Sequence, residues 1–196
     1  TANWSALGGA ATYRIDVSTE ADFGGEAGGN ATDLFFSEYV EGGSNEKYIE
    51  IFNGTGSSVD LSNYALLLFA NGAATPGTSN SLSGTLADGD TIVYRNASAS
   101  NATFTSLTAV GWNGDDAVAL WKKSSSSYVD IFGSIGFDPG SAWTVGAFTT
   151  ADKTLIRLSS VTGGLTSNPA TNFPTLGTEW IQLNVNVITN LDAHTF

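Results

Sequence analysis

The segment LFFSEYVEGGSNEKYIEIFN, from Leu34 to Asn53, decides the fold class of this chain. Two apolar-patterned runs flank the polar insert from Glu41 to Glu46, which contains two adjacent glycines. In the second run Ile49 and Ile51 stand on either side of Glu50, so one strand face can enter a core while the other carries the carboxylate. Short alternating runs separated by turn residues are typical of a hairpin or of neighbouring β-strands.

The same pattern continues along the chain, with turn pairs such as Asn53-Gly54 and Asp88-Gly89 between the runs. Nine such runs predict an all-β, two-sheet sandwich. Two longer loops, Asn71 to Leu86 and Gly133 to Asp152, are where a rigid sandwich would place binding residues. The predicted strands are Leu34 to Val40, Lys47 to Phe52, Tyr64 to Ala70, Thr91 to Arg95, Phe104 to Val110, Ala117 to Lys122, Tyr128 to Phe132, Thr154 to Ser159 and Trp180 to Val187.

Composition excludes several functional classes. Seven basic residues against 19 acidic ones give a formal net charge of -12, which would repel a phosphate backbone, so nucleic acid is not an expected partner. The chain has no cysteine, which excludes disulfides, a thiol nucleophile and a zinc-thiolate site. No apolar run approaches the roughly 20 residues needed to span a bilayer, and Thr1 to Asn3 lack the basic start of a signal peptide.

Residues 1–32 differ from the rest and form a predicted N-terminal extended arm, while residues 33–196 form the sandwich. Tyr13, Ile15 and Val17 alternate with polar residues as in a single strand, and the glycine-rich stretch from Phe23 to Asn30 is typical of a flexible tether. The arm strand has two candidate positions. It adds to an edge of its own domain, or it pairs with the open edge of a neighbouring subunit.

Three blocks of sequence resemble the lamin tail domain of bacterial exported proteins. They are SEYVEGGSNEKYIEIFNGTGSSVDLSNYALLL, then VGWNGDDAVALWKKSSSSYVDIFGSIG, then EWIQLNVNVITNLDAHTF, within about residues 33–196. Agreement of three separate blocks in order is more specific than one short motif. The resemblance implies an immunoglobulin-like β-sandwich in an extracellular or cell-surface protein. It implies little chemistry, because such modules are usually non-catalytic and attached to secreted nucleases, proteases or surface proteins.

Within these blocks the strand from Ala117 to Lys122 carries apolar residues on both faces, so we expect a central position with both faces covered. The hairpin loop is expected at the serine tract Ser124 to Ser127. Large aromatic residues anchor such cores, and the candidates here are Tyr64, Trp143 and Trp180.

No catalytic residue is predicted. A glycosidase needs two carboxyl groups about 5 to 10 Å apart across a cleft, and the spacing of the acidic residues selects no pair. His194 is the only histidine, it lies near the end of the sequence, and the chain has no Gly-x-Ser-x-Gly motif. We therefore expect no Ser-His-Asp triad and a surface or capping role for His194.

Calcium is the most plausible ion, although no cofactor is required, because hard cations prefer carboxylate, amide and backbone oxygens. Asp115 and Asp116 beside Asn113 form one candidate cluster, and Glu38 near Glu50 forms the other. Neither has a complete loop signature, and the competing interpretation is that these residues form turns and solvated surface.

Two further sets of residues are candidates for surface functions. N-x-Ser/Thr sequons predict glycosylation sites, although their number is close to what chance would give in an asparagine-rich chain. Aromatic residues in or near loops could stack on a sugar ring, although aromatics in a sandwich are more often core. The sequon residues are Asn3, Asn30, Asn53, Asn96 and Asn101, and the aromatic residues are Trp112, Phe137 and Trp143.

The sequence thus favours a non-enzymatic extracellular structural or adhesive subunit that self-associates, with Tyr13, Ile15 and Val17 as the subunit contact and a filament as the product. The alternative is an accessory module that binds carbohydrate or another surface polymer.

Overall fold

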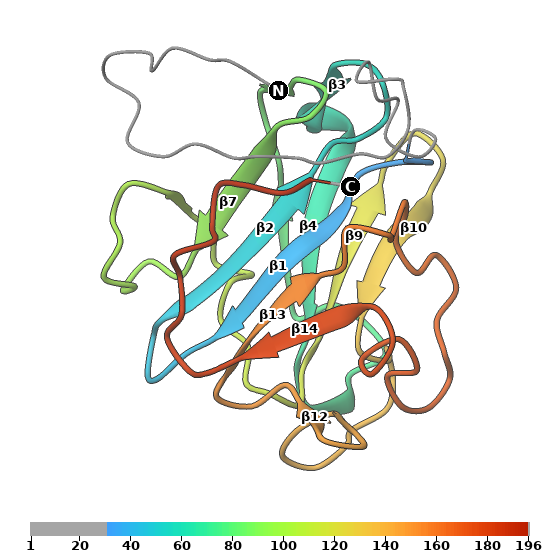
Figure 1. The fold of residues 1–196 in the computed structure, drawn as a ribbon. Coiled ribbons are helices and arrows are strands. Elements are labelled where there is room, and N and C mark those ends of the chain that lie inside the picture. The colour runs from blue at the N-terminus through green and yellow to red at the C-terminus, as the bar shows by residue number, and fades with distance from the viewer. Residues whose placement is uncertain (1–30, 196) are drawn as a thin grey trace, which may run out of the picture.

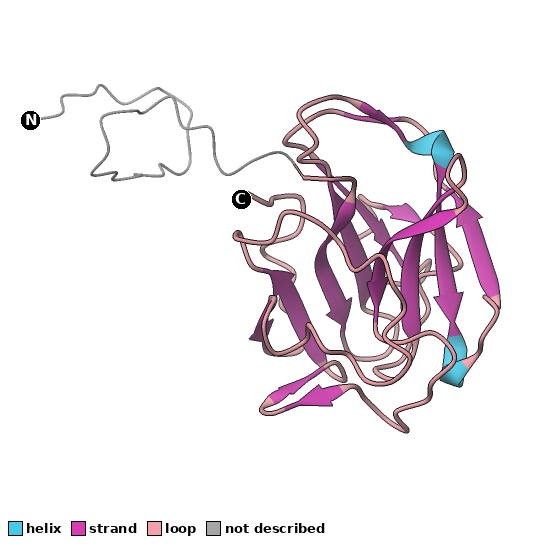
Figure 2. Ribbon diagram, turned by 90° about the vertical axis from the view of Figure 1, so that its right-hand side faces the viewer, coloured by secondary structure: helices cyan, strands magenta, loops and turns pink. Residues whose placement is uncertain are grey.

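The computed structural model describes residues 31–195, whose strands form two main sheets packed face to face. The six-stranded sheet has the order β14-β13-β1-β2-β7-β8, and Figure 1 shows β14, β13, β1 and β2 side by side. The four-stranded sheet has the order β10-β9-β4-β5. Figure 2 shows the strands in two layers with loops at both ends. The predicted all-β immunoglobulin-like sandwich is therefore confirmed.

The strand bounds are β1 (Phe35–Glu41), β2 (Lys47–Phe52), β3 (Val59–Asp60), β4 (Tyr64–Phe69), β5 (Thr78–Ser81), β6 (Thr85–Leu86), β7 (Thr91–Arg95), β8 (Thr105–Ser106), β9 (Ala117–Lys122), β10 (Ser127–Phe132), β11 (Thr144–Val145), β12 (Phe148–Thr149), β13 (Lys153–Arg157) and β14 (Trp180–Leu183). Two single-turn 3-10 helices, η1 (Leu61–Asn63) and η2 (Ala70–Gly72), precede and follow β4.

The opening segment forms the predicted antiparallel pair. β1 and β2 run in register from Glu41 opposite Lys47 to Phe35 opposite Phe52, with a bulge between Phe36 and Glu38. The two strands lie in the middle of the six-stranded sheet, between β13 and β7, and every residue in both is buried. A bulge inserts one extra residue into a strand and changes which face the next side chains take.

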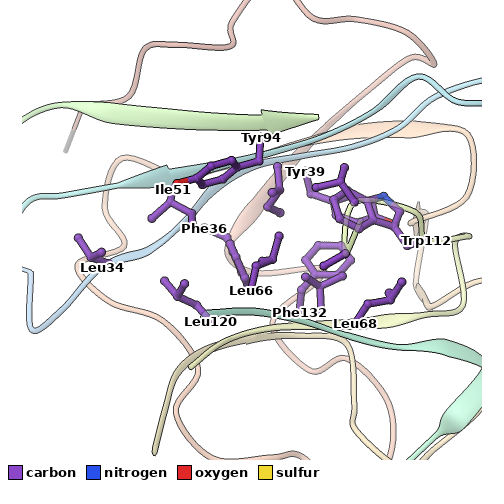
Figure 3. Close-up of a cluster of buried hydrophobic side chains, with 14 of the residues drawn as sticks. Leu34, Phe36, Tyr39, Ile51, Leu66, Leu68, Tyr94, Trp112, Leu120 and Phe132 are labelled. Atoms are coloured by element: carbon purple, nitrogen blue, oxygen red, sulfur yellow. The ribbon is translucent and has the colours of Figure 1, made fainter. Parts of the chain in front are cut away.

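The core lies between the two sheets and is rich in aromatic rings (Figure 3). Tyr39 stacks on Phe132 with ring centroids 3.9 Å apart and on Trp112 at 5.1 Å. Leu66 and Leu120 from the four-stranded sheet point into the same space. Tyr64, Trp143 and Trp180 are buried in this cluster, which confirms their prediction as core anchors.

The strand β9 is central, as predicted. Val118 and Leu120 enter the core between the sheets, whereas Ala117 and Ala119 belong to a second cluster on the opposite face. Trp121 packs against that second cluster and is partly exposed. The serine tract forms the predicted turn between β9 and β10, with the Ser126 N–H donating to the Lys123 carbonyl at 3.3 Å.

The side of the sandwich next to β10 is closed by Asp130. One carboxylate oxygen accepts hydrogen bonds from the Phe36 N–H at 2.9 Å and from the Arg157 guanidinium at 2.7 Å. The other oxygen accepts from the Leu165 N–H at 2.8 Å, and Gly164 passes so close that an added Cβ would lie 2.4 Å from the Asp130 side chain. Asp130 therefore ties β10 to β1, β13 and the following loop.

The opposite side of the sandwich is closed by Asn80 in β5. Its side-chain oxygen accepts a hydrogen bond from the Ala109 N–H at 2.7 Å and from the Thr108 hydroxyl at 3.0 Å. This contact explains one departure from the sequence prediction. The expected strand Phe104 to Val110 shrinks to the two residues of β8, because the chain then turns, with the Val110 N–H donating to Leu107.

The predicted strand Trp180 to Val187 is also too long, since β14 ends at Leu183. Asn186 takes a left-handed conformation with φ 61°, and its side-chain oxygen accepts from the Gly43 N–H at 2.9 Å. The Val187 carbonyl accepts from the Thr154 hydroxyl at 2.7 Å. The turn at Asn186 therefore ends the strand, although the alternation of apolar residues in the sequence continues through Val185.

After β14 the chain crosses the outer face of the six-stranded sheet. Ile188 and Leu191 pack on a cluster that includes Val40, Tyr48 and Val93. In Figure 1 this segment (red) runs up beside β2 toward the top of the molecule. The face of the sheet that points away from the core is therefore partly covered by the C-terminal segment.

Candidate functional site

The structure brings the first predicted carboxylate pair together, because Glu38 and Glu50 lie directly opposite each other in β1 and β2. Both residues are 1 % exposed. One Glu50 oxygen accepts from the Ser37 hydroxyl at 2.7 Å, and the other accepts from the N–H of Asp192 at 2.5 Å and of Ala193 at 3.3 Å. Glu50 therefore fastens the C-terminal segment to the sheet.

Glu38 has the opposite surroundings, because neither of its buried carboxyl oxygens has a hydrogen-bond partner. Burial, and secondarily the neighbouring Glu50, raises the pKa of Glu38 to about 8. Burial also raises the pKa of Glu50, although its three donors oppose that shift. Glu38 is therefore protonated in the folded protein at neutral pH. The two neighbouring carboxyl groups thus do not place two negative charges side by side.

The second predicted cluster is a turn whose oxygens are largely occupied. Asp116 accepts from the Asn71 N–H and from the Asn113 N–H, each at 2.8 Å. Asp115 is buried, one of its oxygens has no partner, and burial raises its pKa. Within residues 31–195, no group of three or more His, Asp or Glu side chains is arranged to hold a metal ion. Calcium binding at either cluster remains a prediction.

His194 is partly buried and is not a simple surface residue. Its ring packs edge-on against Phe52 at 4.9 Å and Phe35 at 5.8 Å. Its Nε2 atom is buried without a hydrogen-bond partner. Burial, and secondarily the Arg157 cation, lowers the pKa of His194 to about 4, so the ring is neutral at pH 7.

The aromatic residues proposed for ligand stacking are placed elsewhere than the sequence suggested. Trp112 and Trp143 are 0 % and 1 % exposed and belong to the core, so their assignment as ligand-binding residues is wrong. Phe137 is half-buried and packs toward Trp143 at 6.0 Å. The reason is physical, since a large ring near the end of a sandwich is stabilised most by closing the core.

An aromatic surface does occur on the outer face of the four-stranded sheet. A groove of about 440 Å³ is lined by residues of β4, β5, β9 and β10, with Trp121 and Tyr128 in edge-on contact at 4.9 Å. The sequence contained a signal for it, because Trp121 alternates with Val118 and Leu120 and must face away from the core. The lining residues are Ala65, Leu67, Pro76, Ser79, Ser81, Trp121, Lys123 and Tyr128.

The sequons differ in their accessibility. Asn53 is fully buried, and its amide nitrogen donates to the carbonyls of Ser57 and Leu86 at 2.9 Å, so it is not a glycan acceptor in the folded protein. The Asn96 amide donates to Val110 at 2.7 Å. The Asn101 side-chain oxygen accepts from the N–H and the hydroxyl of Thr103. Asn3 and Asn30 lie outside the described residues.

The arm residues Tyr13, Ile15 and Val17 also lie outside the described residues. The described chain begins at Ala31, whose N–H donates to the Gly54 carbonyl at 2.8 Å. The described sheets end in edge strands, and contact of the arm with one of these edges remains a prediction. Among these, β14 carries Ile181, which is 46 % exposed, and Val185, two residues past its end, is 41 % exposed.

A family model described as the lamin tail domain matches residues 28–136, which is more than half of the chain and includes β1 to β10. This chain belongs to the lamin tail domain family. The family is a structural immunoglobulin-like domain, which agrees with the sandwich described above. In this lamin tail protein the six-stranded sheet is completed by β13 and β14, which come after the matched residues.

No curated protein matches this lamin tail chain. In the described part of the chain, no helix is long and apolar enough to cross a membrane.

Proposed function

We propose that this lamin tail protein is a non-enzymatic structural subunit that works outside the cell and assembles with copies of itself through its N-terminal arm. The observation that carries the proposal is a combination of donor and acceptor. The sequence supplies a separate alternating strand on a glycine-rich tether, and both sheets of the body end in strands with one unpaired side. Main-chain hydrogen bonds and apolar burial would stabilise the added strand.

The geometry of such a contact favours a filament. Arm and acceptor edge are different surfaces, so each subunit gives its arm to one neighbour and receives an arm from another. A head-to-tail contact of this kind closes into a ring or continues as a fibre. We expect fibres, because only particular rotations between neighbouring subunits close into a ring, and any other rotation continues as a fibre.

The test uses the full chain with the arm strand altered on one face. Ile15→Asp with Val17→Asp removes the apolar face, whereas Arg14→Gln with Asp16→Asn changes only the other face and serves as the matched control. We expect fibres in electron micrographs for the unaltered protein and the control, and single particles for the Asp variant. Deletion of residues 1–20 should give the same result as the Asp variant. Equal assembly of all four proteins would refute the proposal.

A second function, binding of a neutral polysaccharide, is favoured by the groove beside Trp121 and Tyr128. Partly exposed aromatic rings flanked by serine hydroxyls suit a sugar ring, and Lys123 is the one charged residue among those lining this groove. The test is retention on insoluble cellulose and chitin. Trp121→Ala should abolish retention and Phe137→Ala should preserve it. Failure of the unaltered protein to bind either polymer removes this candidate.

A further inference from the structure

The described sheets end in four edge strands, β14, β8, β10 and β5, and three of them are poor acceptors for an added strand. β10 is tied by Asp130 to β1, to Arg157 and to Leu165, which leaves only its first residues open. β5 is tied through Asn80 to residues 108 and 109, and its exposed residues, Ser79 and Ser81, give an added strand no apolar surface. β8 has two residues, too few for a stable ladder.

The fourth edge, β14, has one backbone edge without a strand partner and an exposed apolar side chain. β13 is its only strand partner among the described residues. Trp180 points into the core, so Ile181 points to the outer face, where it is the most exposed large hydrophobic residue in the described chain at 46 %. Val185, in the turn two residues after the end of β14, is 41 % exposed. An isolated apolar pair beside an unpaired strand edge is a surface that other soluble proteins protect.

The face of β14 that points toward the core carries Gln182, whose side chain is already hydrogen-bonded. The Gln182 side chain accepts from the Thr149 N–H at 2.6 Å and donates to the Ala147 carbonyl at 3.4 Å, so β12 lies against the side of β14 that faces the core. A strand added beside β14 would therefore meet polar groups on the inner side and Ile181 on the outer side. This requires a donor with polar residues on one face and apolar residues on the other.

The arm strand Thr12 to Val17 has this alternation, with Tyr13, Ile15 and Val17 on one face and Arg14 and Asp16 on the other. Tyr13 and Val17 are four residues apart in the sequence, as are Ile181 and Val185. We infer that the acceptor for the arm of a second copy of this chain is the free edge of β14, with the apolar arm face packed over Ile181 and Val185. This inference rests on the proposed function and adds the location of the contact.

The tether is long enough for the contact. The thirteen residues from Ser18 to Asn30, between the arm strand and the described body, span at most about 45 Å, compared with a radius of gyration of about 15 Å for a body of this size. The described chain starts beside the top of β10, whereas β14 lies near the lower end of the view in Figure 1. The two ends of the proposed contact therefore lie at different ends of the body. The arm of one subunit meets β14 of a second subunit if the β14 end of the second lies near the start of the described chain of the first.

The test exploits the absence of native cysteine. One protein carries Ile15→Cys in the arm, and its partner carries Ile181→Cys in β14. The two are mixed, allowed to assemble and mildly oxidised. Because the two cysteines are on different chains, any bond between the arm and β14 peptides reports a contact between subunits. Tyr13→Cys and Val17→Cys repeat the measurement, since a disulfide forms only when the Cα atoms are within about 7 Å.

Matched controls place the cysteine on the competing edges, with Ser79→Cys on β5 and Ser127→Cys on β10, both exposed positions. We expect at least about tenfold more arm-linked dimer with Ile181→Cys than with either control for one of the arm positions. Peptide mapping identifies the joined segments, and each variant incubated alone gives the background. A bond to Ser79→Cys or Ser127→Cys instead would overturn the assignment.

A second measurement separates failure of this inference from failure of the proposed function. Ile181→Lys with Val185→Lys changes only exposed side chains, so we expect an unchanged circular dichroism spectrum and loss of fibres. Normal fibres from the Lys variant, together with loss of fibres from the Asp arm variant, would mean that the arm binds another edge. Fibres from both variants would mean that assembly does not use the arm.

Discussion

Glu38 is a carboxyl group whose surroundings oppose its charge. It is buried, neither oxygen is hydrogen-bonded, and Glu50 faces it across the strand pair. The pKa of Glu38 is therefore raised from 4.5 to about 8 in the folded protein. Between these two pH values the folded state holds a proton that the unfolded chain has lost, so the free energy of unfolding falls as pH rises.

Replacing Glu38 by Gln should remove this penalty. At pH 7 the penalty is about 3 kcal/mol, since each pKa unit corresponds to about 1.4 kcal/mol. We expect Glu38→Gln to raise the midpoint of urea unfolding at pH 7 to 8 and to change it little at pH 4. Asp90→Asn, at an exposed position, is the control and should change neither. A variant that is equally destabilised at every pH would show that the carboxyl group has a structural partner.

His194 should produce a pH dependence of opposite sign. Its pKa is lowered from 6.5 to about 4, so between these values the unfolded chain binds a proton that the folded protein excludes. The free energy of unfolding therefore rises with pH over that range. In the native sequence the falling contribution of Glu38 offsets it, so we expect the Glu38→Gln variant to reveal a clear rise from pH 4 to 6.5. The measurement is the unfolding midpoint across that range, and a flat profile in the variant would contradict the burial of the imidazole.

At the scale of elements, Asp130 joins strands from both sheets. The Arg157 guanidinium that it binds is 1 % exposed and lies 4.5 Å from the Trp180 ring centroid. Arg157 also pairs with Glu179 at 3.2 Å, but Asp130 additionally accepts the Phe36 and Leu165 N–H groups, and breaking a buried pair typically costs about 3 to 5 kcal/mol. We expect Asp130→Asn to lower the free energy of unfolding by that amount, measured in urea. Asp138→Asn, in an exposed turn, should cost less than about 1 kcal/mol. A loss of similar size in both variants would mean that Asp130 does not tie the sheets together.

The sequence was sufficient for the strands that form the centre of the sandwich, because their apolar alternation persists over five or more residues. It was insufficient where a side chain from elsewhere in the chain decides the backbone. β8 ends at Ser106, three residues before Ala109, whose N–H donates to the Asn80 side chain. β14 ends at Leu183, three residues before Asn186, whose side chain accepts from the Gly43 N–H. These contacts join residues far apart in sequence, and a periodic pattern contains no information about them.

The candidate site shows the same division. Alternation in β1 and β2 placed Glu38 and Glu50 near each other, and register made them directly opposite. The alternation did not predict that Glu50 accepts from the Asp192 N–H, nor that the Glu38 carboxyl group has no hydrogen-bond partner. Ring size alone could not separate the core residues Trp112 and Trp143 from the groove residue Trp121, because all three are next to loops or strand ends.

At the scale of the whole molecule, the net charge of -12 opposes association of identical subunits. The Debye length is about 30 Å at 0.01 M salt and about 8 Å at 0.15 M, so added salt screens this repulsion. We expect fibres to form faster as sodium chloride rises over that range, followed by light scattering. The Ile15→Asp with Val17→Asp protein should stay unassembled at both concentrations. A rate that falls with salt would instead indicate that attraction between opposite charges controls the encounter.

The position of β14 along the chain affects when a subunit becomes able to assemble. The arm precedes every described strand in the chain, whereas β14 follows all the other described strands. Its edge exists only after β13 and β14 have both been made and docked beside β1. If the arm binds this edge as we propose, a chain that is still being synthesised can offer its arm before it can receive one, and it extends a fibre only once β14 has docked.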